Sequence, residues 1–218
     1  GDDMAKYASS ERTREAIITA TGELVAERGF DNVSIRAIAN RSNTNVGSIH
    51  YHFGSKEKLF EAVLIYVIDW IWGRYFEGIF DEIDLTTAQG RSVAIRKLAQ
   101  AHMEGIFQDE KPYWYNKVLF EAVGSESFLD DIIIEEFVSR DMELMDQIRV
   151  GEGHERPVSM YVVYHILAGV CVFHSNFKGI IIKSMKLQEY PKEYQTILED
   201  MIVELLEKHF GEEPNKGK

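Results

Sequence analysis

The fold is decided by residues 34–60, which read SIRAIANRSNTNVGSIHYHFGSKEKLF. Two short segments with apolar residues at helical spacing flank a polar turn, Ser42-Asn43-Thr44, and a longer apolar helix is expected to follow Ser55. The stretch is basic, because four positive side chains stand against one negative, a net charge of +3 in a chain of net charge −12. Such asymmetry indicates a region with a partner of its own. The charged residues are Arg36, Arg41, Lys56 and Lys58 against Glu57.

Capping residues and glycines set the expected ends of the first helices. The first helix runs over about residues 10–28 and stops at Gly29, which suits the left-handed position after a helix end. Ser34 can cap the second helix through its side-chain oxygen. In the third helix, Val46 and Ile49 are three residues apart, and we expect both to face inward and hold this helix in place.

The rest of the chain also has helical periodicity. Helices are expected near residues 90–107, 112–123, 127–150, 158–186 and 191–209, and no sustained two-residue alternation indicates a strand. We therefore expect an all-α fold, in which a three-helix helix-turn-helix domain at residues 10–56 is joined by a long helix to a helical bundle. The bundle occupies residues 57–210, and residues 1–9 and 211–218 are expected to be flexible tails.

Composition bounds the class of protein. The chain has 218 residues, of which 45% are hydrophobic and 28% charged, so it can bury a core. Its one cysteine, Cys171, cannot form an internal disulfide, which fits a reducing cytoplasm. The first residues are polar and lack the apolar stretch of a signal peptide. The uncharged segment 157–177 contains His165 and His174, so we expect a buried interface helix and no membrane partner.

Two short helices joined by a three-residue turn form a helix-turn-helix, whose second helix enters a major groove of DNA. Asn45 and Ser48 would lie on its outer side, where they can bond base edges or phosphates. Gly47 has no side chain to hold the backbone away from DNA. Tyr51 can bond a phosphate, and so can Lys56, which begins the next helix, where backbone N–H groups also favour an anion.

At these residues the chain resembles the DNA-binding domain of the tetracycline-repressor (TetR) family. The resemblance rests on Gly29-Phe30 after the first helix and on the run His52-Phe53-Gly54-Ser55-Lys56-Glu57-Lys58-Leu59 after the third. It covers about residues 13–63. The rest of the chain is similar only in length and in its all-helical layout, as expected for a family with divergent ligand domains.

Three positions depart from the family pattern. Asn43 replaces the usual glycine of the turn, but asparagine tolerates a left-handed conformation, so the turn should be kept. Thr44 replaces an apolar valine, and its hydroxyl needs a partner. His50 replaces a tyrosine, which puts the phosphate contact there in doubt and could make DNA affinity pH-dependent.

The resemblance implies DNA contacts at the positions that match the family motif. Arginine pairs bidentately with guanine, so Arg36 is a candidate base reader, with a phosphate contact or a solvated helix surface as alternatives. Lys56 is expected to contact a phosphate. The full set of expected DNA-binding residues is Ser34, Arg36, Thr44, Asn45, Gly47, Ser48, His50, Tyr51, His52 and Lys56.

No catalytic, metal or cofactor site is expected. His50 and His52 are two residues apart and diverge on a helix, so they cannot chelate an ion together. The glycine-rich segment 151–154 has no preceding strand, so we interpret it as a helix connection and not as a phosphate loop. An all-helical enzyme remains the alternative class, because a site assembled from distant residues leaves no local pattern.

Aromatic residues near Pro112 could line a small-molecule pocket, since such pockets are mostly apolar, contain a few polar groups and often lie between bundle helices. Ordinary bundle core is the alternative interpretation. The acidic composition slightly favours a neutral or cationic ligand. The candidate pocket residues are His102, Phe107, Tyr113, Trp114, Phe120 and His165.

The last two helices are the expected dimer surface, with burial inside one subunit as the alternative. The family resemblance implies a symmetric four-helix interface. Two-fold symmetry would place two recognition helices about 34–36 Å apart, or further if the half-sites are spaced out. The candidate interface residues are Tyr161, Tyr164, Ala168, Val172, Ser175, Ile197, Met201 and Leu205.

Together these patterns predict a homodimeric, ligand-responsive transcriptional repressor of the cytoplasm, with double-stranded operator DNA and a small-molecule effector as partners. A ligand that prefers the conformation without DNA would lower DNA affinity by the same coupling. The fourth helix is the expected transmission element. An activator, or a regulator without an effector, is the alternative within this class.

Overall fold

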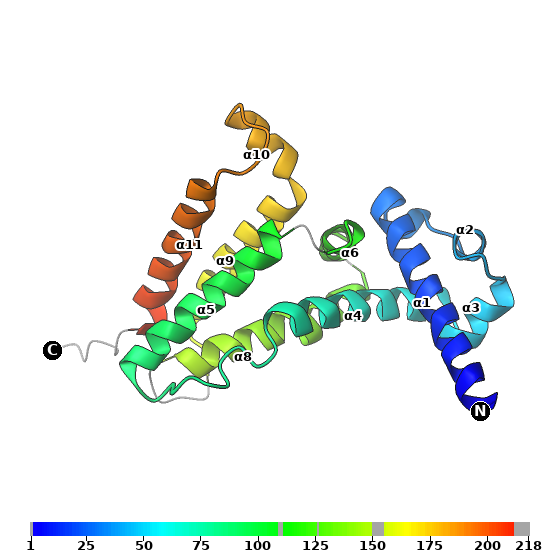
Figure 1. The fold of residues 1–218 in the computed structure, drawn as a ribbon, viewed down its shortest axis with the longest axis horizontal. Helices are drawn as coiled ribbons and strands as arrows, with labels where there is room; N and C mark the ends of the chain where they lie inside the picture. Colours follow the sequence, from blue (N-terminus) through cyan, green and yellow to red (C-terminus); the bar gives the residue numbers. More distant parts are fainter. Residues whose placement is uncertain (1, 109–110, 126, 150–154, 212–218) are drawn as a thin grey trace. The chain divides into compact units, whose positions relative to one another are not determined.

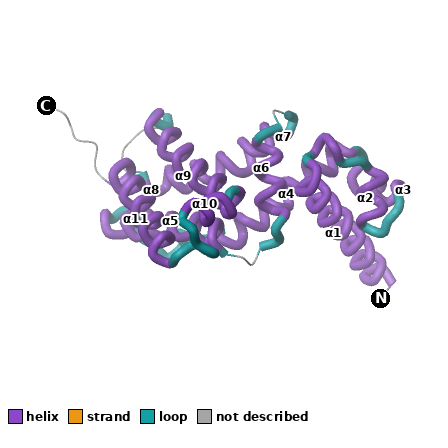
Figure 2. The backbone as a smooth tube through the Cα atoms, turned by 90° about the horizontal axis from the view of Figure 1, so that it is seen from above, coloured by secondary structure: helices purple, strands orange, loops and turns teal. Residues whose placement is uncertain are grey.

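The structure is a computed structural model that describes residues 2–108, 111–125, 127–149 and 155–211. Throughout this part of the chain the regular elements are helices, which confirms the predicted all-α class (Figure 2). With the labels of Figure 1, they are α1 (Asp2–Arg28), a 3₁₀ turn (Phe30–Asn32), α2 (Ile35–Arg41), α3 (Val46–Phe53), α4 (Lys56–Tyr75), α5 (Ala88–Phe107), α6 (Trp114–Val123), α7 (Leu129–Ile132), a π-helix (Ile133–Val138), α8 (Ser139–Ile148), α9 (Val158–Asn176), α10 (Lys178–Ser184), α11 (Lys192–Leu206) and a second π-helix (Glu207–Gly211).

The chain forms two compact units. The first contains residues 1–70 and 111–137, and the second contains residues 71–110 and 138–218. This division differs from the predicted boundary between residues 56 and 57, because most of α4 and all of α6 and α7 group with the N-terminal helices. The units are defined by contacts within the chain, whereas the predicted boundary separates DNA binding from ligand binding and dimerisation. That functional boundary stays a prediction.

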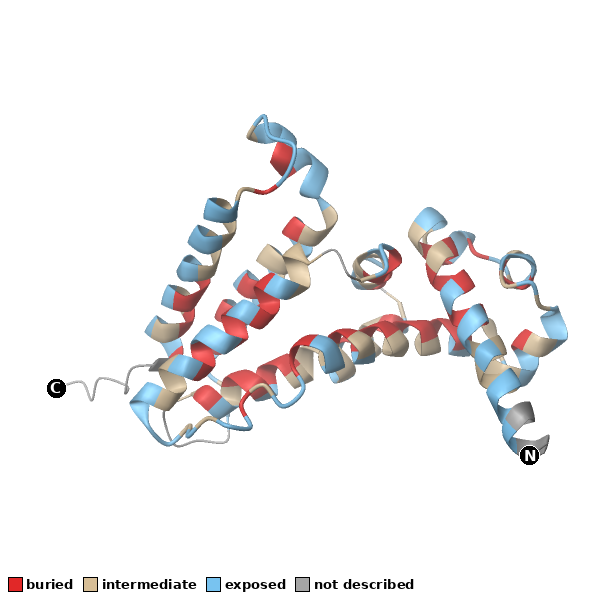
Figure 3. Cartoon of the chain, viewed as in Figure 1, coloured by how far each residue is buried: buried red, intermediate tan, exposed pale blue. Residues whose placement is uncertain are grey.

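The first unit has a core built by the apolar faces of α1, α2, α3 and α4. Ile17 and Leu24 of α1 and Ile38 of α2 are at most 1% exposed, as is Ile49 of α3. Helix α4 has the longest buried stripe, which includes Leu59, Phe60, Val63, Leu64, Val67 and Ile68 (Figure 3). Burial of these side chains is the main stabilising contribution to the unit.

Helix α6 packs against α1 in the same unit. The Trp114 ring lies directly against Gly22, where a Cβ atom would overlap it. Tyr115 beside it forms edge-to-face contacts with Trp70, at 5.0 Å between ring centroids, and with Tyr66 at 6.3 Å. Trp114 therefore belongs to the α1–α6 core.

The second unit is organised around α5, which packs against α8, α9 and α11. Its buried stripe follows the helical period through Ala94, Ile95, Leu98, Ala99 and His102. Thr87 caps the helix, since its hydroxyl accepts a hydrogen bond from the Gly90 N–H at 2.9 Å.

Some helix bounds differ from the predictions. Helix α1 begins at Asp2 and not near Ser10, because the intervening residues contain no glycine or proline. The helix predicted over residues 158–186 is divided at Phe177, whose backbone leaves the helical region at φ −117° and ψ 23°. A π-helix interrupts the one predicted over residues 127–150.

Helix α9 was expected to be a buried interface helix. Among the described residues, this helix has the length and the apolar composition that would allow it to cross a membrane, judged on those two properties alone. Only 28% of its most apolar window is buried. One whole side is therefore exposed in the single chain.

Candidate nucleic-acid interface

Helix α2 begins at a serine cap. The Ser34 hydroxyl accepts a hydrogen bond from the backbone N–H of Ala37 at 3.2 Å, as its position in the sequence predicts. Ile38 and Ala39 are buried below, while Arg36 is exposed on the opposite side. The helix thus divides into a packing face and a solvent face that includes one of the candidate DNA contacts.

The turn after α2 is built as the sequence predicts. Asn43 has a φ of 52°, the left-handed conformation in which asparagine substitutes for glycine. The Thr44 hydroxyl forms a hydrogen bond with the Ser42 hydroxyl, with 2.8 Å between Oγ1 and Oγ. Ser42 donates its own hydrogen to the carbonyl of Ile38 at 2.8 Å, so Thr44 is the donor of that pair. This leaves Thr44 only lone pairs to offer to another partner.

Helix α3 is held by one side and polar on the other. Asn45 is its cap, since its side-chain oxygen accepts the Ser48 N–H at 2.8 Å. Ile49 is 1% exposed, whereas Tyr51 is 83% exposed. Val46 is not the second inward anchor that its spacing predicts: it is 37% exposed, because it is the first helical residue and lies beyond the contact with α2.

The two histidines of α3 differ in their surroundings. The Nδ1 of His50 lies 2.9 Å from the carbonyl oxygen of Gly54, which ends the helix at φ 81°. Because a carbonyl only accepts, Nδ1 must be the protonated nitrogen, and a neutral His50 can then offer only an acceptor at Nε2. His52 is half-buried and lies edge-on to the Tyr51 ring. Ligands for a metal come together nowhere in the described ranges.

Helix α4 begins where the predicted signals place it. The Ser55 hydroxyl accepts the Lys58 N–H at 3.2 Å and caps the helix. The Lys56 ammonium lies 5.3 Å from the centre of the Phe60 ring, so its stem is packed while its charge stays at the helix N-terminus.

Residues 17–63 match the family described as bacterial regulatory proteins of the tetR family. This segment of the chain therefore contains the tetR-family domain. Among its relatives, the transcriptional repressor KstR2 of Mycolicibacterium smegmatis is 36% identical over 62 residues, which are 28% of this chain and 30% of that protein. The transcriptional regulator UidR of Escherichia coli K12 is 36% identical over 64 residues, which are 29% and 32%. The match spans about a third of the length of these curated relatives.

Solved structures resemble this chain over most of its length. A transcriptional regulator from Rhodococcus sp. Rha1 superposes with a TM-score of 0.62, at 20% identity, over 92% of this chain and 99% of the other. GusR of Salmonella enterica gives a TM-score of 0.61, at 16% identity, over 89% and 95%. At these identities the likeness is one of fold.

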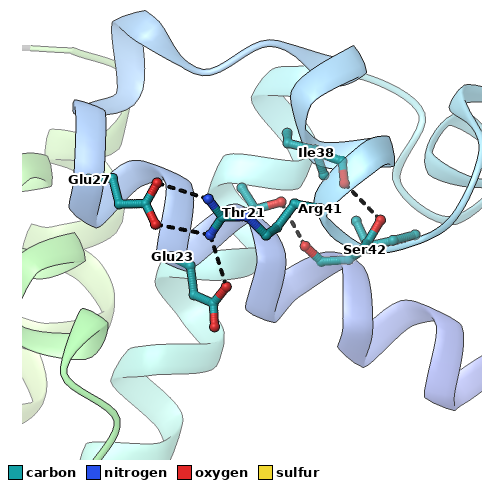
Figure 4. Close-up of polar contacts among 7 residues, drawn as sticks. Thr21, Glu23, Glu27, Ile38, Arg41 and Ser42 are labelled. Carbon is teal, nitrogen blue, oxygen red and sulfur yellow. Dashed lines mark hydrogen bonds and ion pairs between the residues drawn. The ribbon is translucent and has the colours of Figure 1, made fainter.

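The basic stretch at residues 34–60 has fewer unpaired charges than its sequence indicates. Arg41 is paired to Glu27 by two hydrogen bonds, at 2.9 and 3.0 Å, and to Glu23 by a third at 3.1 Å (Figure 4). The hydrogen bond from Arg41 holds the pKa of the Glu27 carboxyl below its usual value. Lys58 pairs with Glu61 at 2.9 Å.

Of the four basic residues of the stretch, Arg36 and Lys56 thus remain without an ion pair to any described residue. Sequence reasoning missed the glutamates, although Glu23 and Glu27 are four residues apart and share one face of α1.

The six candidate pocket residues are divided between the two units. Tyr113 is exposed, Trp114 is core and Phe120 is half-buried in the first unit. In the second unit, His102 is 7% exposed and Phe107 is half-buried, whereas His165 lies on the exposed side of α9.

Sequence reasoning missed the partner of His102. Its Nε2 lies 3.2 Å from Oδ2 of Asp141, and its Nδ1 lies 2.8 Å from the carbonyl oxygen of Leu98. Burial acts to lower the pKa of His102, but the charge of Asp141 and these two hydrogen bonds outweigh burial and raise that pKa. Both nitrogens face acceptors, so the imidazolium form fits this site.

The candidate dimer residues have mixed exposure. Tyr161, Val172, Ile197 and Met201 are exposed, while Ala168, Ser175 and Leu205 are half-buried. Tyr164 is 4% exposed, so in this chain it is core and not interface; burial, with the neighbouring charge of Asp141, raises its pKa. Residues that sequence reasoning missed complete the exposed apolar side: Val162, Ile166 and Phe173.

Cys171 is half-buried. The glycine-rich segment 151–154, interpreted as a helix connection, lies outside the described residues, as do positions 212–218 of the predicted C-terminal tail.

Proposed function

We propose that this protein is a transcriptional repressor whose helix α3 inserts its outer side into the major groove of operator DNA. The observation that carries the proposal is the division of α3 into a buried and an exposed side. Ile49 is 1% exposed, whereas Asn45, Gly47 and Tyr51 are open to solvent. A short, rigidly held helix with small and polar residues outward fits a groove that admits one α-helix.

Electrostatics supports the same docking surface. Arg36 at the start of α2 and Lys56 at the start of α4 have no ion pair to another described residue, and each lies near the N-terminus of its helix. The chain as a whole has a net charge of −12, so most of its surface repels a polyanion. We expect this basic end of the first unit to approach DNA, which restricts the orientation of binding.

A second copy of the chain is the partner that we propose for α9 and α11. Val162, Ile166 and Phe173 on α9 are 46–52% exposed, and Met201 on α11 is 62% exposed. Large apolar side chains exposed along one side of a helix are typical of an interaction site. A two-fold axis there would present two α3 helices to successive turns of DNA.

We propose that the effector binds in the second unit with His102 as one of its polar contacts. His102 and Asp141 are both buried, and Oδ1 of Asp141 has no hydrogen-bond partner among the described residues. An imidazolium beside a carboxylate is neutral as a pair, so this site favours an uncharged ligand with a hydroxyl or amide donor. Phe76, directly after the end of α4, contacts the His102 ring at 4.8 Å and connects this site to the helix that begins at Lys56.

Selection of duplexes from a random pool tests the function, and salt dependence tests the surface. On the selected duplex, Lys56→Ala should weaken binding and reduce the salt slope by about one unit. Lys97→Ala, on the exposed side of α5, removes the same charge from the second unit and should change neither. Failure of the wild-type chain to select any duplex would contradict the proposal.

Arg36→Ala distinguishes the two DNA-contact roles of that residue. If Arg36 reads a base, the variant should lose discrimination at one base pair, at a cost of about 1–3 kcal/mol. An unchanged preference at every position, with a lower salt slope, would assign Arg36 to the phosphate backbone.

A further inference from the structure

The end of helix α2 is tied to α1 by a three-bond ion-pair network. Both terminal nitrogens of Arg41 donate to Glu27, Nη2 to Oε2 at 2.9 Å and Nη1 to Oε1 at 3.0 Å. Nη1 also donates to Glu23 at 3.1 Å. Figure 4 shows the guanidinium directed at the two glutamates of α1. A planar guanidinium bonded by both ends fixes distance and direction, which a single lysine contact cannot do.

This network lies directly before the recognition helix in the chain. Arg41 is the last residue of α2, the Ser42-Asn43-Thr44 turn comes next, and α3 begins at Val46. Helix α2 packs on α1 and α3 packs on α2, while Ile49 is the buried residue of α3 itself. The orientation of α3 therefore depends on where the end of α2 is held.

We infer that Arg41 is a positioning residue for the recognition helix and not a DNA contact. The inference rests on the proposed DNA binding. The hydrogen bonds to the two glutamates occupy three of the five N–H donors of the guanidinium, so a phosphate could reach only the two donors that remain, and it would then lie beside two carboxylates. The network has one positive and two negative side chains, so its net charge repels a phosphate. Its contribution to recognition is to set the angle at which the outer side of α3 meets the groove.

A positioning role and a phosphate contact of Arg41 can be distinguished by comparing the affinity for the selected duplex with the affinity for a scrambled duplex of equal length. A phosphate contact supports both complexes, so its loss lowers both affinities and reduces the salt slope by about one unit. Misplacement of α3 lowers affinity for the selected duplex alone, because base contacts need exact placement. The ratio of the two affinities is therefore the readout, and a purely structural role would not change it below the melting temperature.

Three variants test the inference: Arg41→Gln, Arg41→Lys and the double variant Glu23→Gln/Glu27→Gln. Each should lower the ratio by about tenfold, within the range for residues of one coupled network. Combining Arg41→Gln with the glutamate changes should lower it no further. Arg96→Gln is the matched control, since it breaks an exposed pair with Asp200 at 3.9 Å on the second unit.

Several results would overturn the inference. An unchanged ratio in Arg41→Lys, with a salt slope reduced in Arg41→Gln, would make Arg41 a phosphate contact. Unchanged binding in the glutamate variant would show that the network does not position α3. Arg41→Lys keeps the charge and serves if Arg41→Gln does not fold. If the wild-type chain selects no duplex, the proposed function itself fails, an outcome distinct from normal binding by all variants.

Discussion

Replacement of Asp141 by asparagine removes the negative partner of a buried histidine. The side chains of His102 and Asp141 are both 7% exposed, and the hydrogen bond between them is 3.2 Å long. Loss of one partner from a buried ion pair costs about 3–5 kcal/mol. Asparagine keeps an acceptor oxygen, so we expect the lower limit, about 3 kcal/mol. For a chain of this size that lowers the melting temperature by about 6–12 °C.

The stability that is lost in Asp141→Asn should depend on pH, and the raised pKa of His102 determines whether the loss grows or shrinks with pH. The folded protein holds the pKa of His102 above its ordinary value. Such a group contributes stability that is fully present below the unfolded pKa of about 6.5 and is lost as pH rises through the folded pKa. Without the carboxylate, burial favours the neutral form of His102, and the charge that opposed burial is gone, although the hydrogen bond to the Leu98 carbonyl remains. The difference between wild type and variant should therefore be largest near pH 5.5 and shrink above neutrality.

Thermal unfolding from pH 5.5 to 8.5 measures this difference. Asp200→Asn is the control, because that carboxylate is 68% exposed and its pair with Arg96 is 3.9 Å long. Exposed pairs of this kind contribute about 0–1 kcal/mol at any pH. A loss in Asp141→Asn that stays constant over the whole range, or that grows with pH, would refute the assignment of a charged His102.

Two further predictions concern the packing of α1 against α6 and the association of two chains through α9. Gly22→Ala should destabilise the protein by about 1–3 kcal/mol in thermal unfolding, because the added methyl overlaps the Trp114 ring. Gly73→Ala, where the new Cβ would meet its nearest neighbour at an ordinary 3.5 Å, should not, and equal effects would disprove the tight α1–α6 contact. Ile166→Glu, at a position 46% exposed on α9, should produce monomers in analytical ultracentrifugation. Val93→Glu on α5, 41% exposed, should not, and a dimeric Ile166→Glu protein would exclude α9 from the interface.

The local features of the first unit could be predicted from the sequence because each depends on neighbours within a few residues. Ser34 and Ser55 cap their helices as predicted, and Asn43 takes the left-handed turn position. Ile49 faces inward as predicted, whereas Val46, three residues earlier on α3, does not. Hydrogen bonds between residues two to four positions apart leave a signature in the order of residue types.

Features that depend on contacts between distant residues could not be predicted in the same way. Arg41 adds to the positive charge of its stretch in the sequence, but its partners Glu23 and Glu27 are on another helix. His102 was a candidate pocket residue, but its partner Asp141, whose carboxylate favours the protonated imidazole, is 39 residues further along the chain. Pairing across such separations is set by packing, which a single sequence does not show.

Helix α9 illustrates a third difficulty. Its residues are apolar on nearly every side, so periodicity cannot tell the buried side from the exposed one. Tyr164 was expected at the interface and is core, whereas Ile166, two positions further and on a different side, is exposed. Only the packing of α5 against α9 decides between them.

Chemical protection of DNA distinguishes insertion of the outer side of α3 into a major groove from other modes of binding. Dimethyl sulfate methylates guanine N7 in the major groove and adenine N3 in the minor groove, so one reaction on the selected duplex reports both. We expect the wild-type protein to protect guanine N7 in two patches about 34–36 Å apart or further. We expect both patches to be lost in Tyr51→Ala, which alters a side chain that is 83% exposed. Protection confined to adenine N3, or protection of N7 that persists unchanged in Tyr51→Ala and in Asn45→Ala, would contradict it.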